Sequence, residues 1–180
     1  MKRIKKEKKE KIMDLIQKAG DPNNYETSWD EGGLIHKIKK KSNIARGKNS
    51  RAKGARFELK VRKDLESKGR IVDKWTNNVD LIEGKIIPAK RKYNPFFKAL
   101  SIGTGFPDFI SIRQISEELY SVIGVEVKIN GTLSKEEKEK CQWYLKEKIF
   151  SKILIAKSIR QGKKINIEYD DFSEKYSPKQ

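Results

Sequence analysis

Two charged residues with an obvious chemical use lie inside a stretch that otherwise has the composition of a buried strand. Apolar and β-branched residues dominate 120–129 (YSVIGVEVKI), which predicts a β-strand there. Because successive side chains of a strand point to opposite faces, Glu126 and Lys128 share one face, about 7 Å apart. Burying two charges on a strand is costly unless they pair or bind an ion. The two are therefore either a structural ion pair or part of a site.

The spacing Glu-x-Lys carries no information without that context. It occurs six times in the chain, and five of the copies lie in polar surroundings that predict exposed helix or loop. Only Glu126 and Lys128 lie in an apolar strand, and Gly124 leaves room beside them on the same face.

A second carboxylate lies on the strand predicted just before this one, over 106–112 (FPDFISI). Asp108 shares a face of that strand with Phe106 and so points toward an apolar layer, while Pro107 suits the first residues of a strand. The alternative is an aspartate in a turn after proline. If the two strands pair, Asp108 and Glu126 come within reach of one cation, which would remove the repulsion between them.

A divalent cation held by these carboxylates would have a defined use. Mg²⁺ prefers oxygen ligands and keeps several waters, so Asp108 and Glu126 suit it. Such an ion polarises a phosphodiester and lowers the pKa of a bound water. Lys128 would orient the nucleophile or stabilise the negative charge of the transition state. The pattern predicts metal-assisted hydrolysis of a phosphodiester.

Two predicted helices add polar residues at the edges of their buried faces. Apolar residues at helical spacing predict helices over 55–68 and 134–149. Glu58 and Gln142 each lie one residue beyond such an apolar position, about 100° round the helix. Glu58 could bind the metal directly or through water, and Gln142 could hold the lysine or a phosphate. The alternative for each is an ordinary solvated side chain.

The composition narrows the class of protein. Of 180 residues, 42 are Lys or Arg and 25 are Asp or Glu, and the net charge of +17 attracts a polyanion. One cysteine and one histidine exclude an internal disulfide and a His/Cys zinc site, so a metal must sit on carboxylates. No apolar run approaches the roughly 20 residues of a membrane span, and no signal peptide opens the chain. We expect a cytoplasmic, intracellular protein without membrane contact.

Positive charge is concentrated in the first third of the chain and in one later loop. Residues 32–57 contain no acidic residue and nine lysines and arginines, which phosphate contacts explain better than the alternative, a solvated linker. The loop predicted over 84–104 is also basic, and its aromatic residues could stack on unpaired bases or pack back onto the domain. The residues expected to contact DNA are Lys48, Arg51, Lys53, Arg56, Lys90, Arg91 and Lys92.

The order of predicted elements gives the fold class. From Ser50 it is helix, two or three strands, helix, strand, which predicts an α/β fold with a mixed sheet. Residues 1–49 are expected to form a basic N-terminal extension of a helix and a linker, 50–172 the main domain and 173–180 a polar tail. The helix of the extension has apolar residues at helical spacing, namely Ile12, Leu15, Ile16 and Ala19.

These residues together resemble the PD-(D/E)xK nuclease superfamily, over about residues 50–156. Pro107-Asp108 matches its PD, and Glu126-Val127-Lys128 matches its ExK. The segment 53–65 is similar to the first helix of archaeal Holliday-junction resolvases. Closer to the VRR-NUC branch are the segments 105–110, 125–128 and 133–145.

The resemblance implies a restriction-endonuclease-like core, with a central mixed β-sheet flanked by helices. It implies that Lys128 is the catalytic lysine and that the Val127 carbonyl is a metal ligand. It further implies cleavage of DNA with Mg²⁺ or Mn²⁺ by a homodimer, here a structure-specific endonuclease for Holliday junctions or flaps in DNA repair or recombination. The acidic and polar site residues that it implies are Glu58, Asp108, Glu126 and Gln142.

Two features depart from the family pattern. The loop 84–104 is longer than the resolvase connection, and the extension up to residue 49 has no counterpart in compact members. Two other functions fit the sequence. One is a non-catalytic nucleic-acid-binding protein in which Glu126 and Lys128 are only an ion pair. The other is a restriction-type endonuclease that recognises a base sequence.

Overall fold

The fold is described from a computed structural model, which covers residues 2–88, 91–94, 99–102, 105–162 and 164–176. By its internal contacts the chain divides into two compact units, here called the N-terminal unit (Met1–Ala55) and the C-terminal unit (Arg56–Gln180). The division falls inside helix α2 (Lys41–Ser67), which begins in the first unit and ends in the second. Within these described ranges no helix is long and apolar enough to cross a membrane.

The N-terminal unit is more regular than the sequence predicted. It contains α1 (Lys2–Ala19), an antiparallel hairpin of β1 (Tyr25–Trp29) and β2 (Ile35–Lys40), and the first part of α2. The expected linker is therefore wrong. The two isoleucines of β2 are partly buried, while its lysines are exposed. Helix α2 begins at Lys41, before the predicted start at residue 55, because no proline between these positions interrupts it.

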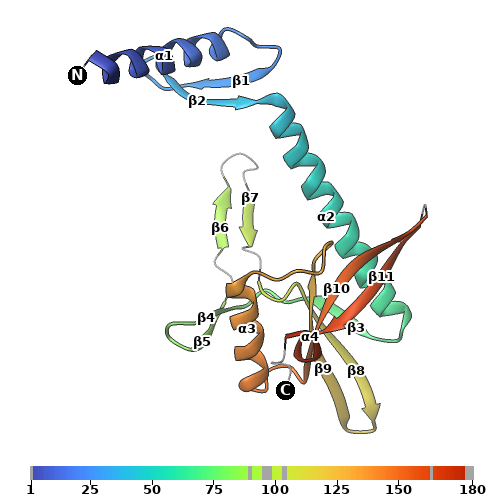
Figure 1. Cartoon of the computed structure of the whole chain (residues 1–180). Coiled ribbons are helices and arrows are strands. Elements are labelled where there is room, and N and C mark those ends of the chain that lie inside the picture. Colours follow the sequence, from blue (N-terminus) through green and yellow to red (C-terminus); the bar gives the residue numbers. More distant parts are fainter. Residues whose placement is uncertain (1, 89–90, 95–98, 103–104, 163, 177–180) are drawn as a thin grey trace. The chain divides into compact units, whose positions relative to one another are not determined.

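The C-terminal unit is built around a five-stranded mixed sheet (Figure 1). Its strand order is β11-β10-β9-β8-β3; β9 and β10 run parallel and the other neighbours antiparallel. A parallel pair needs a crossover, which contains helix α3 (Lys135–Lys146). The strands are β3 (Ile71–Lys74), β8 (Phe109–Ser116), β9 (Leu119–Val127), β10 (Lys152–Gln161) and β11 (Lys164–Asp171).

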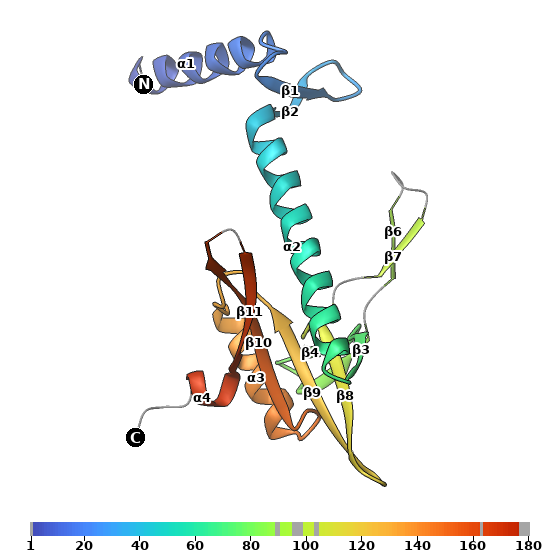
Figure 2. The same ribbon diagram turned by 90° about the vertical axis from the view of Figure 1, so that its right-hand side faces the viewer.

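Helices α2 and α3 cover opposite faces of this sheet, each with its own apolar core (Figure 2). On the α2 face, Phe57, Val61 and Leu65 of the helix pack against Phe109 of β8 and Val125 of β9. Side chains of β9 alternate between the two faces of the sheet. Val125 therefore points to the α2 side, and its neighbour Glu126 points to the α3 side.

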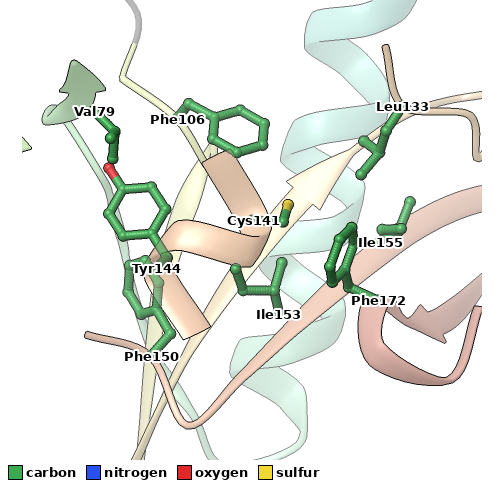
Figure 3. Close-up of a cluster of buried hydrophobic side chains, with 9 residues drawn as sticks. All are labelled: Val79, Phe106, Leu133, Cys141, Tyr144, Phe150, Ile153, Ile155 and Phe172. Carbon is green, nitrogen blue, oxygen red and sulfur yellow. The ribbon is translucent and has the colours of Figure 1, made fainter. Parts of the chain in front are cut away.

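The core on the α3 face is rich in aromatic residues (Figure 3). The Tyr144 ring lies 5.1 Å from that of Phe150 and 6.3 Å from that of Trp75, measured between centroids. The Trp75 Nε1–H donates to the Tyr144 hydroxyl at 3.1 Å. The short helix α4 (Phe172–Tyr176) begins at the last residue of the predicted main domain and continues into the expected polar tail, and it adds Phe172. The other members are Val79, Phe106, Leu133, Cys141, Ile153 and Ile155.

Two small hairpins lie between β3 and β8, where the sequence predicted a loop over 84–104. β4 (Asn78–Asp80) pairs with β5 (Lys85–Ile87), and β6 (Arg91–Asn94) pairs with β7 (Ala99–Ile102). The prediction of a loop is therefore wrong for β5, β6 and β7, whereas β4 lies before the range of that prediction.

The structure confirms an α/β fold with a mixed sheet flanked by helices. The strand expected over 106–112 begins later, at Phe109, because Pro107 has no N–H for a ladder bond. The capping box that opens α3, from Ser134 to Glu137, is present. The restriction-endonuclease-like core stays a prediction.

Candidate active site

The candidate site lies where the pairing of β8 with β9 ends. The last regular pair is Phe109 with Val125. Two residues earlier on the β8 side, Pro107 has no N–H to donate to Val127, so the ladder cannot continue. Asp108 lies just beyond the last regular pair, beside the strand that carries the second carboxylate.

Hydrogen bonds hold the two carboxylates side by side. The Asp108 N–H donates to Oε2 of Glu126 at 3.1 Å, and the Val127 N–H donates to Oδ2 of Asp108 at 2.9 Å. Side chains thus replace the missing ladder bonds. Glu126 is 4% exposed, whereas Asp108 is half-buried. The structure therefore brings together the two carboxylates predicted on adjacent strands.

Two glycines allow the backbone to come this close. A Cβ on Gly105 would collide with the carbonyl oxygen of Trp75, and one on Gly124 would lie 2.9 Å from Cγ of Pro107. The sequence pointed to free space beside Gly124, but the ring of Pro107 fills it. The segment before Asp108 is anchored from the other side as well, because the Trp75 N–H donates to the Asp108 carbonyl at 3.2 Å.

The ammonium of Lys128 lies between two carboxylates. Its Nζ is 3.0 Å from Oε1 of Glu126 and 2.6 Å from Oε1 of Glu137 on the first turn of α3. The capping box holds Glu137 in place: the Ser134 N–H donates to Oε2 of Glu137 at 2.7 Å, and the Glu137 N–H donates to Oγ of Ser134 at 3.3 Å. One residue thus both caps α3 and binds the lysine.

Burial and crowding control the charges of the site. Burial, together with the negative charge of Asp108, raises the pKa of Glu126 to about 8, and burial likewise raises the pKa of Asp108. Although burial opposes it, the hydrogen bond to Glu137 and the charge of Glu126 raise the pKa of Lys128. Burial also acts against Glu137, but its bonds from Lys128 and Ser134 lower its pKa. Glu137 is therefore the firmly anionic partner of the lysine.

An open cavity of about 320 Å³ lies over these groups. It exposes the Asp108–Glu126 pair and the Lys128 ammonium to solvent from the side of α3. The ammonium of Lys140, whose side chain is 12% exposed, pairs with Glu136 at 2.6 Å on its rim. The lining residues are Asn78, Gly105, Phe106, Asp108, Glu126, Lys128, Ser134, Glu136, Glu137 and Lys140.

Glu58 lies close to the pair but does not line this cavity. Its charge contributes to the raised pKa of Asp108, after burial, so the two carboxylates are near each other. Oε2 of Glu58 is bound by Nζ of Lys74 at 3.1 Å. The sequence analysis missed Lys74, a cation on β3 with nothing local to distinguish it from the many other lysines.

The structure does not bring Gln142 into the site, which corrects the prediction for this residue. Gln142 is exposed and does not line the cavity. On a helix it lies five residues after Glu137, about 140° round the axis and 7.5 Å further along. Glu137 occupies the place beside Lys128 that the sequence assigned to Gln142. The local signal for Glu137 is the capping box, which accounts for a glutamate at this position without any role in the site.

The predicted DNA contacts are only partly described. Lys48, Arg51 and Lys53 are exposed on the N-terminal part of α2, and Arg56 is exposed at the start of the C-terminal unit. Arg51 lies only about 60° round the helix from Lys48, but Lys53 lies about 140° from Lys48, so the first three do not share one face. Arg91 and Lys92 begin β6, and Lys90 lies outside the described residues, as do Phe96 and Phe97.

The donor set fits a divalent cation with oxygen ligands. Asp108 and Glu126 have raised pKa values, a cost of burial and mutual repulsion that a cation would relieve. The Val127 carbonyl points to the same side as its N–H, where Pro107 offers no donor. Among the residues that the structure describes, no three His, Cys, Asp or Glu side chains form a preassembled metal site, so water would complete the shell of Mg²⁺.

Comparisons with known proteins identify no family. No family model matches the chain, and no curated protein or solved structure matches it either. The functional conclusion therefore depends on the geometry of the site and on the charge of the chain.

Proposed function

We propose that the protein is a metal-dependent endonuclease that hydrolyses phosphodiester bonds in DNA, with branched or otherwise structured DNA as its substrate. The observation that carries the proposal is the pair of the half-buried Asp108 and the buried Glu126, with the Lys128 ammonium held 3.0 Å from Glu126, beside an open cavity. A purely structural ion pair would not need a second, half-buried carboxylate with a raised pKa beside it.

Asp108, Glu126 and the Val127 carbonyl would hold Mg²⁺ or Mn²⁺, and Glu58 would reach it through water. When bound, the ion supplies Lewis acidity to the phosphodiester and lowers the pKa of a coordinated water. Lys128, which lines the cavity with its ammonium between Glu126 and Glu137, would stabilise negative charge that develops on the phosphoryl oxygens. Glu137 holds that ammonium in place.

The charge of the chain supports DNA as the partner. A net charge of +17 provides strong, sequence-independent attraction to a phosphate backbone. The exposed cations of α2 are spread around the helix, which suits contacts to more than one strand or arm better than a single groove. We therefore favour structured DNA over a short base sequence as the feature recognised.

Three substitutions test this proposal. Asp108→Asn, Glu126→Gln and Lys128→Met should each lower cleavage of a labelled four-way junction or flap in Mg²⁺ by at least about 100-fold while leaving binding intact. Glu139→Gln and Lys146→Met, which change the same charges on exposed positions of α3, should cleave normally. EDTA should abolish cleavage. Cutting that survives Asp108→Asn, or that proceeds in EDTA, would reject the site.

A second candidate function is non-catalytic DNA binding. It is favoured by the pairing of Lys128 with two carboxylates, which satisfies the ammonium without any ligand. Binding of junction DNA without cleavage in Mg²⁺ or Mn²⁺ would support it. Discrete bands from unbranched plasmid DNA would instead indicate a restriction-type enzyme.

A further inference from the structure

The described part of the N-terminal unit has no core of its own. Of the described side chains in residues 7–55 none is buried, and each buried hydrophobic residue of the described chain lies at Phe57 or later. A unit of this size that buries so little needs stabilisation from elsewhere, commonly by oligomerisation. The unit nevertheless exposes six large apolar side chains: Ile12, Met13, Leu15, Ile16, Trp29 and Leu34.

Four apolar residues of α1 form one continuous stripe, here called the α1 stripe: Ile12, Leu15, Ile16 and Ala19. At 100° per residue they fall within an arc of about 100°. Although α1 contacts both β1 and β2, the three large side chains of the stripe are 45–56% exposed. Exposed apolar patches of this kind mark interaction surfaces.

We propose that the α1 stripe packs antiparallel against the same stripe of a second copy of this chain. The partner must be apolar, because the stripe carries no donor or acceptor for a phosphate or a base edge. In a two-fold dimer the same surface is used on both chains, so the α1 stripe of each copy provides the apolar partner for the stripe of the other. The inference concerns the N-terminal unit and does not depend on the proposed nuclease activity.

The charge of α1 selects the antiparallel orientation. Residues 2–11 carry seven lysines and arginines and two glutamates, whereas the stripe occupies the other half of the helix. Parallel pairing would align the two basic segments. Antiparallel pairing centred between Leu15 and Ile16 sets Ile12 opposite Ala19. It then places Lys9 opposite Pro22, beyond the last turn of the other helix, where the helix dipole favours a cation.

The oligomeric state of the full chain tests the proposal. By analytical ultracentrifugation at micromolar concentration we expect the wild-type chain to be a dimer and the double variant Ile12→Glu, Ile16→Glu to be a monomer. The matched control is the double variant Ile82→Glu, Ile115→Glu, which adds the same two charges at residues that are 98% and 60% exposed in the C-terminal unit, and it should stay dimeric. Circular dichroism should show that the C-terminal unit, which holds each buried hydrophobic residue of the described chain, stays folded in both variants.

Cysteine cross-linking tests the orientation. A disulfide requires Cα atoms within about 7 Å, so Leu15→Cys near the two-fold axis should cross-link to its own copy. Lys8→Cys lies on the same side of α1, but antiparallel pairing would separate its two copies by about 22 Å. It should not cross-link. The unmodified chain controls for Cys141, which is buried.

Three results would overturn the proposal. A monomeric wild-type chain would leave the α1 stripe to a different partner. A dimer that persists in the Ile12→Glu, Ile16→Glu variant would place the interface elsewhere. Efficient cross-linking of Lys8→Cys would show a parallel arrangement.

Discussion

At the scale of single residues, the site separates two tasks between two glutamates. Glu126 is almost fully buried beside Asp108, and the pKa of each is raised. Glu137 is better solvated and its pKa is lowered, so it keeps the negative charge that Lys128 needs. Lys128 can thus stay protonated even when the pair of Asp108 and Glu126 binds a proton and carries less negative charge.

The role of Glu137 can be tested by Glu137→Gln. Gln still accepts a hydrogen bond in the capping box, so α3 should keep its start. The charge-assisted bond to Lys128 is lost, and such bonds contribute about 1.5–3 kcal/mol, so we expect DNA cleavage to fall roughly tenfold or more. Single-turnover kinetics on a four-way junction measures this. Glu139→Gln is the control, and equal rates for the two variants would contradict the assignment.

The raised pKa of Glu126 predicts an unusual dependence of stability on pH. In the folded protein Glu126 keeps its proton up to a pH of about 8, whereas in the unfolded chain it loses it near 4.5. The native state therefore binds more protons between these values, and its stability falls as the pH rises from 4.5 to 8. Carboxylates with lowered pKa values are already ionised in this window.

Thermal unfolding in EDTA measures this effect. We expect Tm to fall by roughly 5 °C or more from pH 5 to pH 8, since 1 kcal/mol moves Tm by about 2–4 °C in a chain of this size. Glu126→Gln should flatten the profile, and Glu139→Gln should not. A wild-type Tm that rises steadily over this range would show that Glu126 is ionised throughout.

At the scale of elements, the site depends on three elements, each of which has one of its ends at the site. β8 begins late because of Pro107, β9 continues past its last pair with β8, and α3 starts opposite with Glu137 in its first turn. The close packing of Gly124 against Pro107 and Phe150 sets how near Asp108 comes to β9.

Gly124→Ala tests this packing. The added methyl group would meet Cγ of Pro107 at 2.9 Å and Cδ2 of Phe150 at 3.2 Å. We expect a loss of about 1–3 kcal/mol in the free energy of unfolding, measured in urea, with weaker cleavage because Asp108 is displaced. Gly54→Ala, on α2 with open space around its Cβ, should be neutral or stabilising. A neutral Gly124→Ala would mean that Pro107 can move away.

At the scale of the whole molecule, charge and apolar surface are distributed unequally. The C-terminal unit contains the buried core and the candidate site, whereas the N-terminal unit contributes exposed cations and exposed apolar side chains. Under the proposed function, the C-terminal unit would carry the chemistry and the N-terminal unit would carry contacts with partners.

The salt dependence of DNA binding tests the contribution of the N-terminal unit. Replacing Lys48, Arg51 and Lys53 by Gln should flatten the plot of log K against log salt by about 0.9 for each phosphate contact that is lost. The matched control replaces three exposed lysines of the C-terminal unit, Lys135, Lys146 and Lys164. An equal change of slope in both variants would mean that net charge alone matters.

Local patterns in the sequence determined the parts of this protein that depend on near neighbours. The alternation of residues 120–129 predicted which side chains of β9 share a face. The proline before Asp108 indicated the start of a strand, which begins two residues after it, at Phe109. The capping box of α3 followed from two residues three positions apart. Each of these features follows from backbone geometry over a few residues.

Only the tertiary structure decided which side chains meet. Gln142 and Glu137 both lie on α3, and the choice between them depends on where the crossover from β9 sets that helix against the sheet. That placement comes from the fit of Tyr144, Phe150 and their neighbours in the core, a collective property of residues distant in the chain. The hairpin of the N-terminal unit was missed for a related reason, because exposed lysines hide the alternation on which a strand prediction depends.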